Sequence, residues 1–490
     1  MDLLQPLMAA LAPLTLFYII LGVVLGIVVG SIPGLTGSML IALSLPFTFT
    51  MEAVNAISML VAMYVGAVSG SLITAVLMRM PGTAASVMTT FDGYPMTQQG
   101  KAGRAIGLAI VASFVGGIIS WIFLVLLARP LSIIAVRFTP FDFFAMIMMA
   151  LALLVVLSRG NMLKGLIAGF LGMLIALPGL DPIGGNYRFT YGIDALNDGF
   201  KLLPVLVGLF AGNQVLAEVL RPGGQRATAG VRQDLKGMFM GLRDFSRHWI
   251  GMIRASLIGT WIGILPGVGA NIGSAFAYSI AKSFSRQPEE FGKGAEEGVI
   301  ASEAANNATV GGALVPLFAL GIPGSVIDAI LIGGLIIHGL QPGPGLYRAN
   351  PEFVETVLAS VLIANIVMLG VMYLATGFIA RIASVPTKLL LPGVLVLCVI
   401  GSFALANSWF DVGVMLAFAV IGFAMERKDY PLAPLVIGLV LAPIAETSLR
   451  QATMYTGGSV WPLLATPVPI ICAILTAGMW YMMFRVRRVE

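Results

Sequence analysis

The stretch Gly26–Ser38, GIVVGSIPGLTGS, contains a Pro-Gly pair inside an otherwise apolar run. A related stretch, Gly259–Asn271 or GTWIGILPGVGAN, follows much later in the chain. A shift of 233 residues aligns the two stretches and places Pro33 on Pro266. Proline removes a backbone donor and glycine permits a positive φ, so each Pro-Gly pair predicts a break in a helix.

Each half of the chain carries a second Pro-Gly pair. A shift of 242 residues aligns Pro81-Gly82 with Pro323-Gly324, which ends the stretch NNATVGGALVPLFALGIPGS. The second half therefore has nine more residues between its two breaks, and we expect most of them in the charged loop Ser285–Glu297. Four breaks that match in pairs indicate two structural repeats.

The composition predicts a protein built for a membrane. Of the 490 residues, 58% are hydrophobic and only 10% are charged, with a mean hydropathy of +0.96, whereas soluble domains carry about 25% charged residues. We expect an all-α polytopic membrane protein with roughly 10–12 transmembrane helices of about 20 residues each. The net charge of +5 lies in short loops without interleaved aromatic residues, which argues against nucleic acid as a partner.

Loop charge indicates how the repeats are related. Only Asp2 precedes the first half's breaks, whereas the basic linker 221–248 precedes those of the second half. The loop that leaves the breaks carries Lys101 and Arg104 in the first half, but only Arg348 in the second. Because Lys and Arg favour the cytoplasmic side, this reversal predicts inverted repeats, with the linker and the C-terminus in the cytoplasm.

These patterns divide the chain into three parts. They are a first membrane repeat, 1–220, with its motif region at 26–104; the linker 221–248; and a second membrane repeat, 249–490, with its motif region at 259–340. Outside the motif regions we expect helices at 105–128, 139–157, 163–180, 201–220, 355–380, 389–406, 411–425, 432–445 and 460–484.

Broken helices in a membrane must face protein or a water-filled cavity, because unpaired backbone groups are costly in hydrocarbon. Helix N-termini that point into one cavity offer N–H donors and partial positive charge, which suits a carboxylate. We therefore predict an anion site at the breaks, while the GxxxG spacing of Gly22, Gly26 and Gly30 by itself favours helix packing.

The predicted substrate-binding residues are the backbone and polar groups beside the four breaks. They are Ser31, Gly34, Thr36, Gly37, Ser38, Arg79, Gly82, Thr83, Gly267, Gly269, Asn271, Asn306, Asn307, Gly324 and Ser325. Each hydroxyl or amide could instead cap a helix or bridge two helices. Carbonyls freed near Gly267, together with Asn271 and Asn306, are candidate ligands for Na⁺.

Two acidic residues lie within apolar runs. Glu303 and Asp328 are candidates for binding a coupling Na⁺ or carrying a proton, because ionisable groups at membrane depth are costly and tend to be functional. A salt bridge or an interfacial position is the alternative for both residues. Arg79 could pair with a substrate carboxylate or extend to the membrane interface.

Enzyme signatures are absent from the sequence, which contains no HExxH, GxSxG or complete Walker A motif. With only two histidines and with two cysteines in apolar runs, no histidine-based triad or metal cluster is expected. We therefore predict a protein that is not an enzyme and has no resident cofactor beyond the coupling cation.

The motifs DGYP, PEEFGKGAEEGV and EAANNA, together with both Pro-Gly stretches, resemble the large membrane subunit of the tripartite tricarboxylate transporters, the TctA type. This resemblance implies a bacterial inner-membrane carrier driven by Na⁺ or H⁺. It implies two partners, a small membrane subunit of the TctB type and a periplasmic binding protein of the TctC type. It also implies an organic carboxylate substrate, such as citrate. The chain departs from the family pattern at Arg79, where asparagine is usual.

Two other functions remain open at the level of sequence. An intramembrane enzyme could use Glu303 and Asp328 as paired carboxylates, and a passive anion channel could use the same broken helices. The sequence also leaves open which carboxylate and which cation are carried, and whether the protein forms a homodimer within the membrane lipid.

Overall fold

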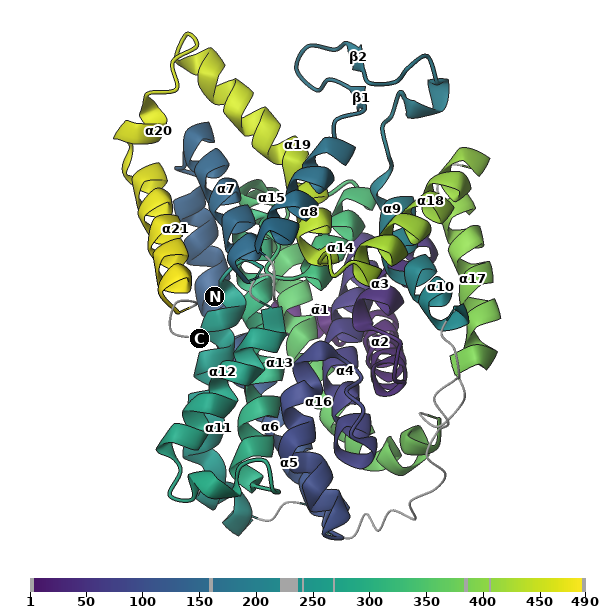
Figure 1. Ribbon diagram of the computed structural model, residues 1–490, viewed down its shortest axis with the longest axis vertical. Coiled ribbons are helices and arrows are strands. Elements are labelled where there is room, and N and C mark those ends of the chain that lie inside the picture. The colour runs from purple at the N-terminus through teal and green to yellow at the C-terminus, as the bar shows by residue number, and fades with distance from the viewer. Residues whose placement is uncertain are drawn as a thin grey trace.

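The computed structural model describes residues 4–157, 162–220, 237–239, 242–267, 269–382, 387–404 and 407–486. Residues 221–236 of the predicted basic linker and residues 487–490 of the C-terminal tail lie outside this part. Helices dominate the described chain (Figure 1). Its strands are the two-residue segments β1 (Gly179–Leu180) and β2 (Tyr187–Arg188), which pair antiparallel. The all-α prediction is confirmed.

Seven helices among the described residues are long and apolar enough to cross a membrane. They are α2 (Pro13–Ser31), α4 (Ala53–Met78), α6 (Ala102–Ala135), the continuous segment Leu202–Val219, α16 (Pro351–Ile382), α18 (Trp409–Arg427) and α19 (Leu432–Tyr455). Shorter apolar segments lie in α3 (Gly37–Thr48), α7 (Pro140–Leu157), α8 (Met162–Ile175), α14 (Val326–Ile337), α17 (Thr387–Ala404) and α21 (Pro467–Val486). The chain is a multi-pass membrane protein.

The first motif region folds as a long, a short, a long and a short helix. After α1 (Leu4–Ala10), α2 ends at the first Pro-Gly pair and α3 follows it. The second long helix, α4, ends at the second pair, and η1 (Ala84–Ser86) and α5 (Val87–Gln98) follow. Gly34 has a φ of 91°, a left-handed conformation that glycine adopts without steric cost.

The second motif region repeats this order with α11 (Leu242–Ile264), α12 (Gly269–Phe284), α13 (Glu296–Leu320) and α14. The connection from α12 to α13 spans residues 285–295 and includes η4 (Pro288–Glu290), whereas α3 and α4 are joined by residues 49–52 alone. Most of the nine extra residues therefore lie in the charged loop, as the sequence predicts. The short helix α15 (Pro344–Ala349) follows α14.

Packing between the long helices repeats residue by residue. A Cβ atom on Gly30 would overlap with the Ala67 carbonyl oxygen, and one on Gly263 would overlap with that of Thr309. The shifts of 233 and 242 residues found in the sequence carry the first pair onto the second. The pair Gly70 and Ile27 is likewise repeated as Gly312 and Thr260. These glycines let the helix backbones approach closely, which confirms their packing role.

Corresponding short helices of the two repeats lie toward opposite ends of the molecule. The first-repeat helix α3 contacts α14, and the second-repeat helix α12 contacts α5. Figure 1 shows α14 in the upper half of the molecule and α5 at its lower end. Because α3 corresponds to α12 and α5 to α14, this arrangement is the one that inverted repeats produce.

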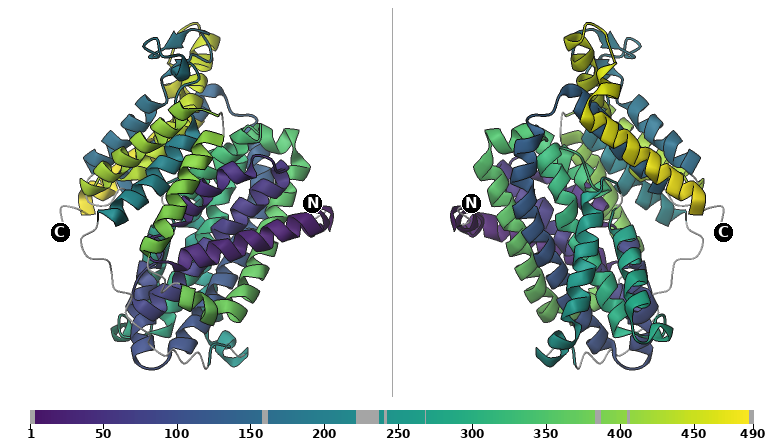
Figure 2. Two further views of the ribbon diagram at one scale, coloured as in Figure 1. Left: turned by 90° about the vertical axis from the view of Figure 1, so that its right-hand side faces the viewer. Right: turned by 90° about the vertical axis from the view of Figure 1, so that its left-hand side faces the viewer.

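The remaining helices surround this broken-helix core. The long helix α6 packs on α13 of the other repeat, and α16 packs on α4. One outer group consists of α7, α8, α19, α20 (Pro462–Ala465) and α21, and Figure 2 shows it as a tilted arm beside the core. A second outer group consists of α9 (Leu202–Val207), η3 (Gly208–Gly212), α10 (Asn213–Val219), α17 and α18.

Several predicted helix boundaries were wrong. The helix expected at 163–180 ends at Ile175, and the β1–β2 hairpin and η2 (Asp194–Leu196) occupy the next residues. The helix expected at 432–445 continues to Tyr455. The helix expected at 460–484 is two helices, α20 and α21, each of which begins at a proline, the residue that suits a first helical turn.

Ion pairs attach the β1–β2 hairpin to α19. Arg188 binds both carboxylate oxygens of Glu446, at 2.5 and 2.6 Å, and Arg450 binds Asp181 at 2.7 Å. The Arg450 hydrogen bond, with a second one from the Ile183 N–H, lowers the pKa of the Asp181 carboxyl to about 2. The hairpin is therefore held by partners more than 250 residues away, which explains why local sequence pattern did not reveal it.

Candidate functional site

The four helix breaks meet in pairs. Within the first repeat, a Cβ atom on Gly82 would overlap with the Gly30 carbonyl oxygen, so the second break lies against the first. Within the second repeat, the Gly267 N–H donates to the Gly324 carbonyl at 2.8 Å. The predicted residues Gly82, Gly267 and Gly324 therefore lie where two breaks touch.

The breaks also meet across the two repeats. A Cβ atom on Gly37, at the start of α3, would lie 3.4 Å from a methyl group of Ile327 at the start of α14. The hydroxyls of Tyr64 on α4 and Ser325 before α14 are 3.2 Å apart. On the other side of the core, α12 contacts η1. Each break therefore contacts a break of its own repeat and one of the other repeat.

Several of the predicted hydroxyls act as helix caps. Thr36 accepts a hydrogen bond from the Met39 N–H at 3.2 Å, and Ser325 accepts one from the Asp328 N–H at 3.3 Å. Thr83 is at the start of η1 and donates to Ser71 at 3.2 Å. A hydroxyl oxygen that accepts a cap bond still has an O–H to donate, so Thr36 and Ser325 can each cap a helix and bind an anion.

The other residues on the rim of the breaks differ in burial. Ser31 is buried and donates to the Val28 carbonyl at 2.7 Å within its own helix. The side chains of Ser38 and Asn271 are partly exposed. A Cβ atom on Gly34 would meet only a Gln214 side-chain nitrogen, at 3.7 Å, and one on Gly269 would meet open space. The backbone is thus accessible at both Gly34 and Gly269.

Arg79 and Gly321 occupy equivalent positions in the two repeats, where α4 and α13 end. Both adopt the left-handed conformation, with φ values of 56° and 72°. Glycine is the usual residue at such a helix end, and a side chain there carries a steric cost. The Arg79 side chain is exposed, and its guanidinium lies 6.0 Å from the centre of the Tyr94 ring. The structure places Arg79 beside the second break.

Two polar residues of α13 are buried and hydrogen-bonded to other helices. The Asn307 side chain accepts a hydrogen bond from Ser69 of α4 at 2.6 Å. The Glu303 carboxylate accepts hydrogen bonds from Thr89 of α5 and, at 3.3 Å, from Ser113 of α6. These bonds connect α13 of the second repeat to α4, α5 and α6 of the first.

Asp328 and Asn306 are buried without such partners. Both side chains are fully buried. Among the described residues, neither carboxylate oxygen of Asp328 and neither amide atom of Asn306 has a partner that meets hydrogen-bond geometry. Asp328 lies three residues after the cap residue Ser325, where a carboxylate commonly returns a bond to the cap N–H. The Ser325 N–H and hydroxyl lie close enough to interact with the Asp328 carboxylate, but neither meets that geometry. Unpaired buried polar groups are rare and costly, which marks both residues as candidates for binding a ligand.

The candidate Na⁺ ligands lie on two helices and one break. Gly267 lies in the third break, Asn271 is on α12 and Asn306 is on α13. Oxygen ligands suit hard cations. In the described part of the chain, no group of three His, Cys, Asp or Glu side chains could hold a metal ion. A cation site among these residues would therefore use carbonyl and amide oxygens, with fewer than three carboxylates.

Sequence reasoning did not assign a role to Asp92, the acidic residue of the DGYP motif. Its Oδ1 accepts hydrogen bonds from the N–H groups of Gly292, Gly294 and Ala295 at 2.8–2.9 Å, and its Oδ2 accepts one from the Tyr278 hydroxyl at 2.8 Å. Asp92 thus fixes the PEEFGKGAEE loop of the second repeat to α5 of the first. The DGYP motif was the available signal, but its partners lie about 200 residues away.

An ionic cluster next to the loop that Asp92 binds was also not predicted. Arg104, considered only for its charge, binds Asp244 of α11 at 2.7 Å and Glu296 of α13 at 3.0 Å. His248 lies 3.1 Å from the other Glu296 oxygen. The cluster connects α6, α11 and α13.

Comparison with known proteins gives one family match and two similar proteins. The family described as the tripartite tricarboxylate transporter TctA family matches residues 16–437. A protein of Agrobacterium vitis, described as an uncharacterized 52.8 kDa protein in the TAR-I ttuC' 3' region, is 32% identical over 472 residues, covering 96% of this chain and 93% of the relative. A second protein of that organism, from the TAR-II ttuC' 3' region, is 32% identical over 224 residues, covering 44% of this chain and 93% of the relative. No solved structure gives a significant match.

Proposed function

Because this chain belongs to the tripartite tricarboxylate transporter TctA family, we propose that it is the large permease subunit of a secondary transporter that imports a di- or tricarboxylate. A periplasmic binding protein of the TctC type delivers the substrate, and a small membrane subunit of the TctB type completes the complex. The complex lies in the bacterial inner membrane and is driven by symport of Na⁺ or H⁺.

The observation that best supports this proposal is that Asp328, at the start of α14, and Asn306 on α13 are fully buried and lack a side-chain hydrogen bond of good geometry in the described chain. An ionised carboxylate buried without a partner is strongly disfavoured, so it calls for a bound cation or a proton. We assign cation coupling to Asp328, with Glu303 as a second acidic group. The Asn306 amide, on a helix that packs against α12, contributes to the cation site or to the substrate site.

The substrate carboxylates are bound by the exposed N–H groups where α3, α12 and α14 begin, since a helix N-terminus favours an anion. Thr36 and Ser325 donate their hydroxyl protons to the substrate oxygens, and Thr83 does so in exchange for its hydrogen bond to Ser71. Arg79, with its exposed guanidinium, binds a further carboxylate.

Transport proceeds by alternating access. The broken-helix core carries the site, and the outer helices seen as a tilted arm in Figure 2 are the surface against which it moves. In this scheme the two inverted repeats exchange conformations, so that the site opens to one side and then to the other.

The experiment is uptake of labelled carboxylate by proteoliposomes that contain this protein, its small subunit and its binding protein. We expect accumulation when an inward Na⁺ or proton gradient is imposed, and acceleration of exchange by unlabelled substrate on the opposite side. Uptake that does not depend on either gradient would exclude symport. Flux without such exchange would favour a passive channel.

A further inference from the structure

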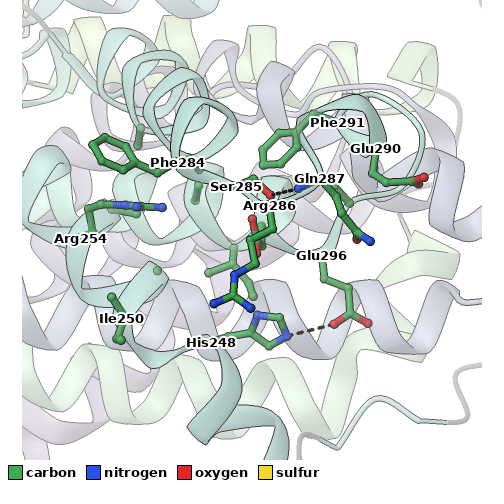
Figure 3. A pocket seen from close by; sticks show the side chains of 18 of the residues that line it. His248, Ile250, Arg254, Phe284, Ser285, Arg286, Gln287, Glu290, Phe291 and Glu296 are labelled. Atoms are coloured by element: carbon green, nitrogen blue, oxygen red, sulfur yellow. Dashed lines mark hydrogen bonds and ion pairs between the residues drawn. The ribbon is translucent and has the colours of Figure 1, made fainter.

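A large cavity lies away from the helix breaks. It has a volume of about 710 Å³ and is lined by the first half of α11, the end of α12 and the loop that leads into α13. Figure 3 shows its wall, with Arg254 and Phe284 on one side and Arg286 and His248 on another. The α11 helix follows the predicted cytoplasmic linker, so the cavity lies at the end of the molecule assigned to the cytoplasm.

Three arginines line this cavity: Arg247, Arg254 and Arg286. None of them has an ion-pair partner within the described residues. Arg254 instead lies 5.2 Å from the centre of the Phe284 ring, and Figure 3 shows its guanidinium and that of Arg286 pointing into the same space. Three uncompensated guanidinium groups around one cavity favour an anionic ligand.

The carboxylates of the cavity compensate this charge only in part. Glu296 is already bound by Arg104 at 3.0 Å and by His248 at 3.1 Å. Glu290 and Glu297 also line the cavity, but both are exposed, and within the described residues neither forms an ion pair with the arginines. The ion-paired Glu296 therefore leaves the arginines available to an added anion.

A glycine provides the space between two of the arginines. Arg247 and Arg254 are seven residues apart on α11 and thus share one face of the helix. Gly251 lies between them on that face, and a Cβ atom there would meet nothing within 4 Å. The glycine leaves room for a group the size of a phosphate to sit between the two guanidiniums.

The edge of the cavity is apolar and open. Ile250 is 63% exposed and Phe284 is 73% exposed, and both line the cavity. The exposed face of α11 continues with Trp249 and Ile253. In a membrane protein such a surface faces lipid, so a ligand that binds the arginines would lie beside acyl chains.

We propose that this cavity binds the phosphate headgroup of an anionic phospholipid. The phosphate occupies the space over Gly251 between Arg247 and Arg254, Arg286 closes over it from the loop, and the acyl chains lie along the apolar face of α11. A basic pocket beside membrane helices on the cytoplasmic side is a setting in which proteins bind anionic headgroups. A small soluble anion would use the arginines but would gain nothing from Ile250 and Phe284.

The test measures lipid binding to the purified full-length protein in detergent by native mass spectrometry. Phosphatidylglycerol and phosphatidylcholine are added at matched concentrations, and glycerol 3-phosphate serves as the soluble competitor. We expect preferential retention of phosphatidylglycerol, weakened roughly fivefold for each substitution Arg247→Gln, Arg254→Gln or Arg286→Gln. This is the factor expected from the attraction of one cationic side chain to anionic lipid. Arg348→Gln, on α15 outside the cavity, is the matched control.

A second variant tests the space without removing charge. Gly251→Leu should occupy the space between Arg247 and Arg254 and reduce phosphatidylglycerol binding, whereas Gly251→Ala, whose Cβ atom meets nothing within 4 Å, should leave binding close to that of the native protein. Equal retention of the two lipids, or binding that survives both Gly251→Leu and the three arginine substitutions, would overturn the proposal. Displacement of the lipid by equimolar glycerol 3-phosphate would also overturn it, in favour of a site for small anions. None of these readouts depends on transport.

Discussion

Asp92 shows how one residue can connect the two repeats. Its carboxylate accepts three backbone N–H groups from the loop before α13 and one hydroxyl from α12. Because the side chain is fully buried, no water can replace these bonds. The nearby Gly298 has no room for a Cβ atom against the Asp92 carboxylate, so the motif and the loop fit each other closely.

We predict that Asp92→Ala lowers the free energy of unfolding by roughly 3–5 kcal/mol, because four donors lose their bond to one fully buried carboxylate. Tyr278→Phe removes only one of the four bonds and should cost about 1–2 kcal/mol. Unfolding in detergent, followed by tryptophan fluorescence, measures both changes. Equal stability of the two variants would contradict the role assigned to Asp92.

Asp181 gives a pH dependence with a definite sign. Its folded-state pKa of about 2 lies below the ordinary value of 3.8, because Arg450 stabilises the ionised form. The ion pair therefore holds the hairpin above pH 4 and is lost as the pH falls through about 2. A fluorophore on a Tyr191→Cys variant should show constant anisotropy from pH 7 to pH 4, whereas adding Asp181→Asn should lower it throughout. A transition centred near pH 4 would mean that the carboxylate is unpaired.

The glycines of α2 and α11 set the distance between long helices. Gly30 leaves no room for a Cβ atom against the Ala67 carbonyl oxygen, whereas Gly370, in the middle of α16, has nothing within 4 Å. We expect Gly30→Ala to destabilise the protein by about 1–3 kcal/mol through overpacking. Gly370→Ala should be neutral or slightly stabilising, because alanine favours a helix. Unfolding in detergent distinguishes the two, and equal stability would show that α2 and α4 can separate freely.

The elements that sequence could predict are those with local signals. Each Pro-Gly pair interrupts an apolar run and ends a helix within a few residues, so the breaks after α2, α4, α11 and α13 were all foreseen. The hairpin after α8 was not, because its attachment depends on Glu446 and Arg450 in a distant helix. Helix ends fixed by tertiary contacts carry no mark in the local sequence.

The same reasoning applies to the candidate site. The sequence placed polar residues beside the breaks, and Thr36 and Ser325 proved to be caps there. The sequence could not distinguish the surroundings of Glu303 from those of Asp328. Glu303 accepts hydrogen bonds from two hydroxyls, whereas no hydrogen bond of good geometry reaches the Asp328 carboxylate in the described chain. That difference arises from which helices pack against α13 and α14. A single sequence does not specify that packing.

The placement of the short helices fits two inverted repeats at the scale of the whole molecule. The connections after α5 and after α14 should therefore emerge on opposite sides of the membrane. Lys101→Cys and Gln341→Cys place exposed thiols in these connections, while the native Cys398 and Cys472 are buried. A membrane-impermeant thiol reagent applied to intact cells should label the variant at 341 and spare the variant at 101. Labelling of both from one side would contradict the inversion.

The central claim is that the unpartnered Asp328 couples a cation to carboxylate transport. The most direct measurement compares Asp328→Asn with the native protein in proteoliposomes, for accumulation under a Na⁺ or proton gradient and for exchange without a gradient. The control is Asp411→Asn, because Asp411 on α18 is also buried but is paired with Lys201 at 3.0 Å. We predict that Asp328→Asn loses at least about tenfold in gradient-driven accumulation, the factor that corresponds to 1.4 kcal/mol, while it retains exchange. Accumulation at the native level in Asp328→Asn would contradict the account.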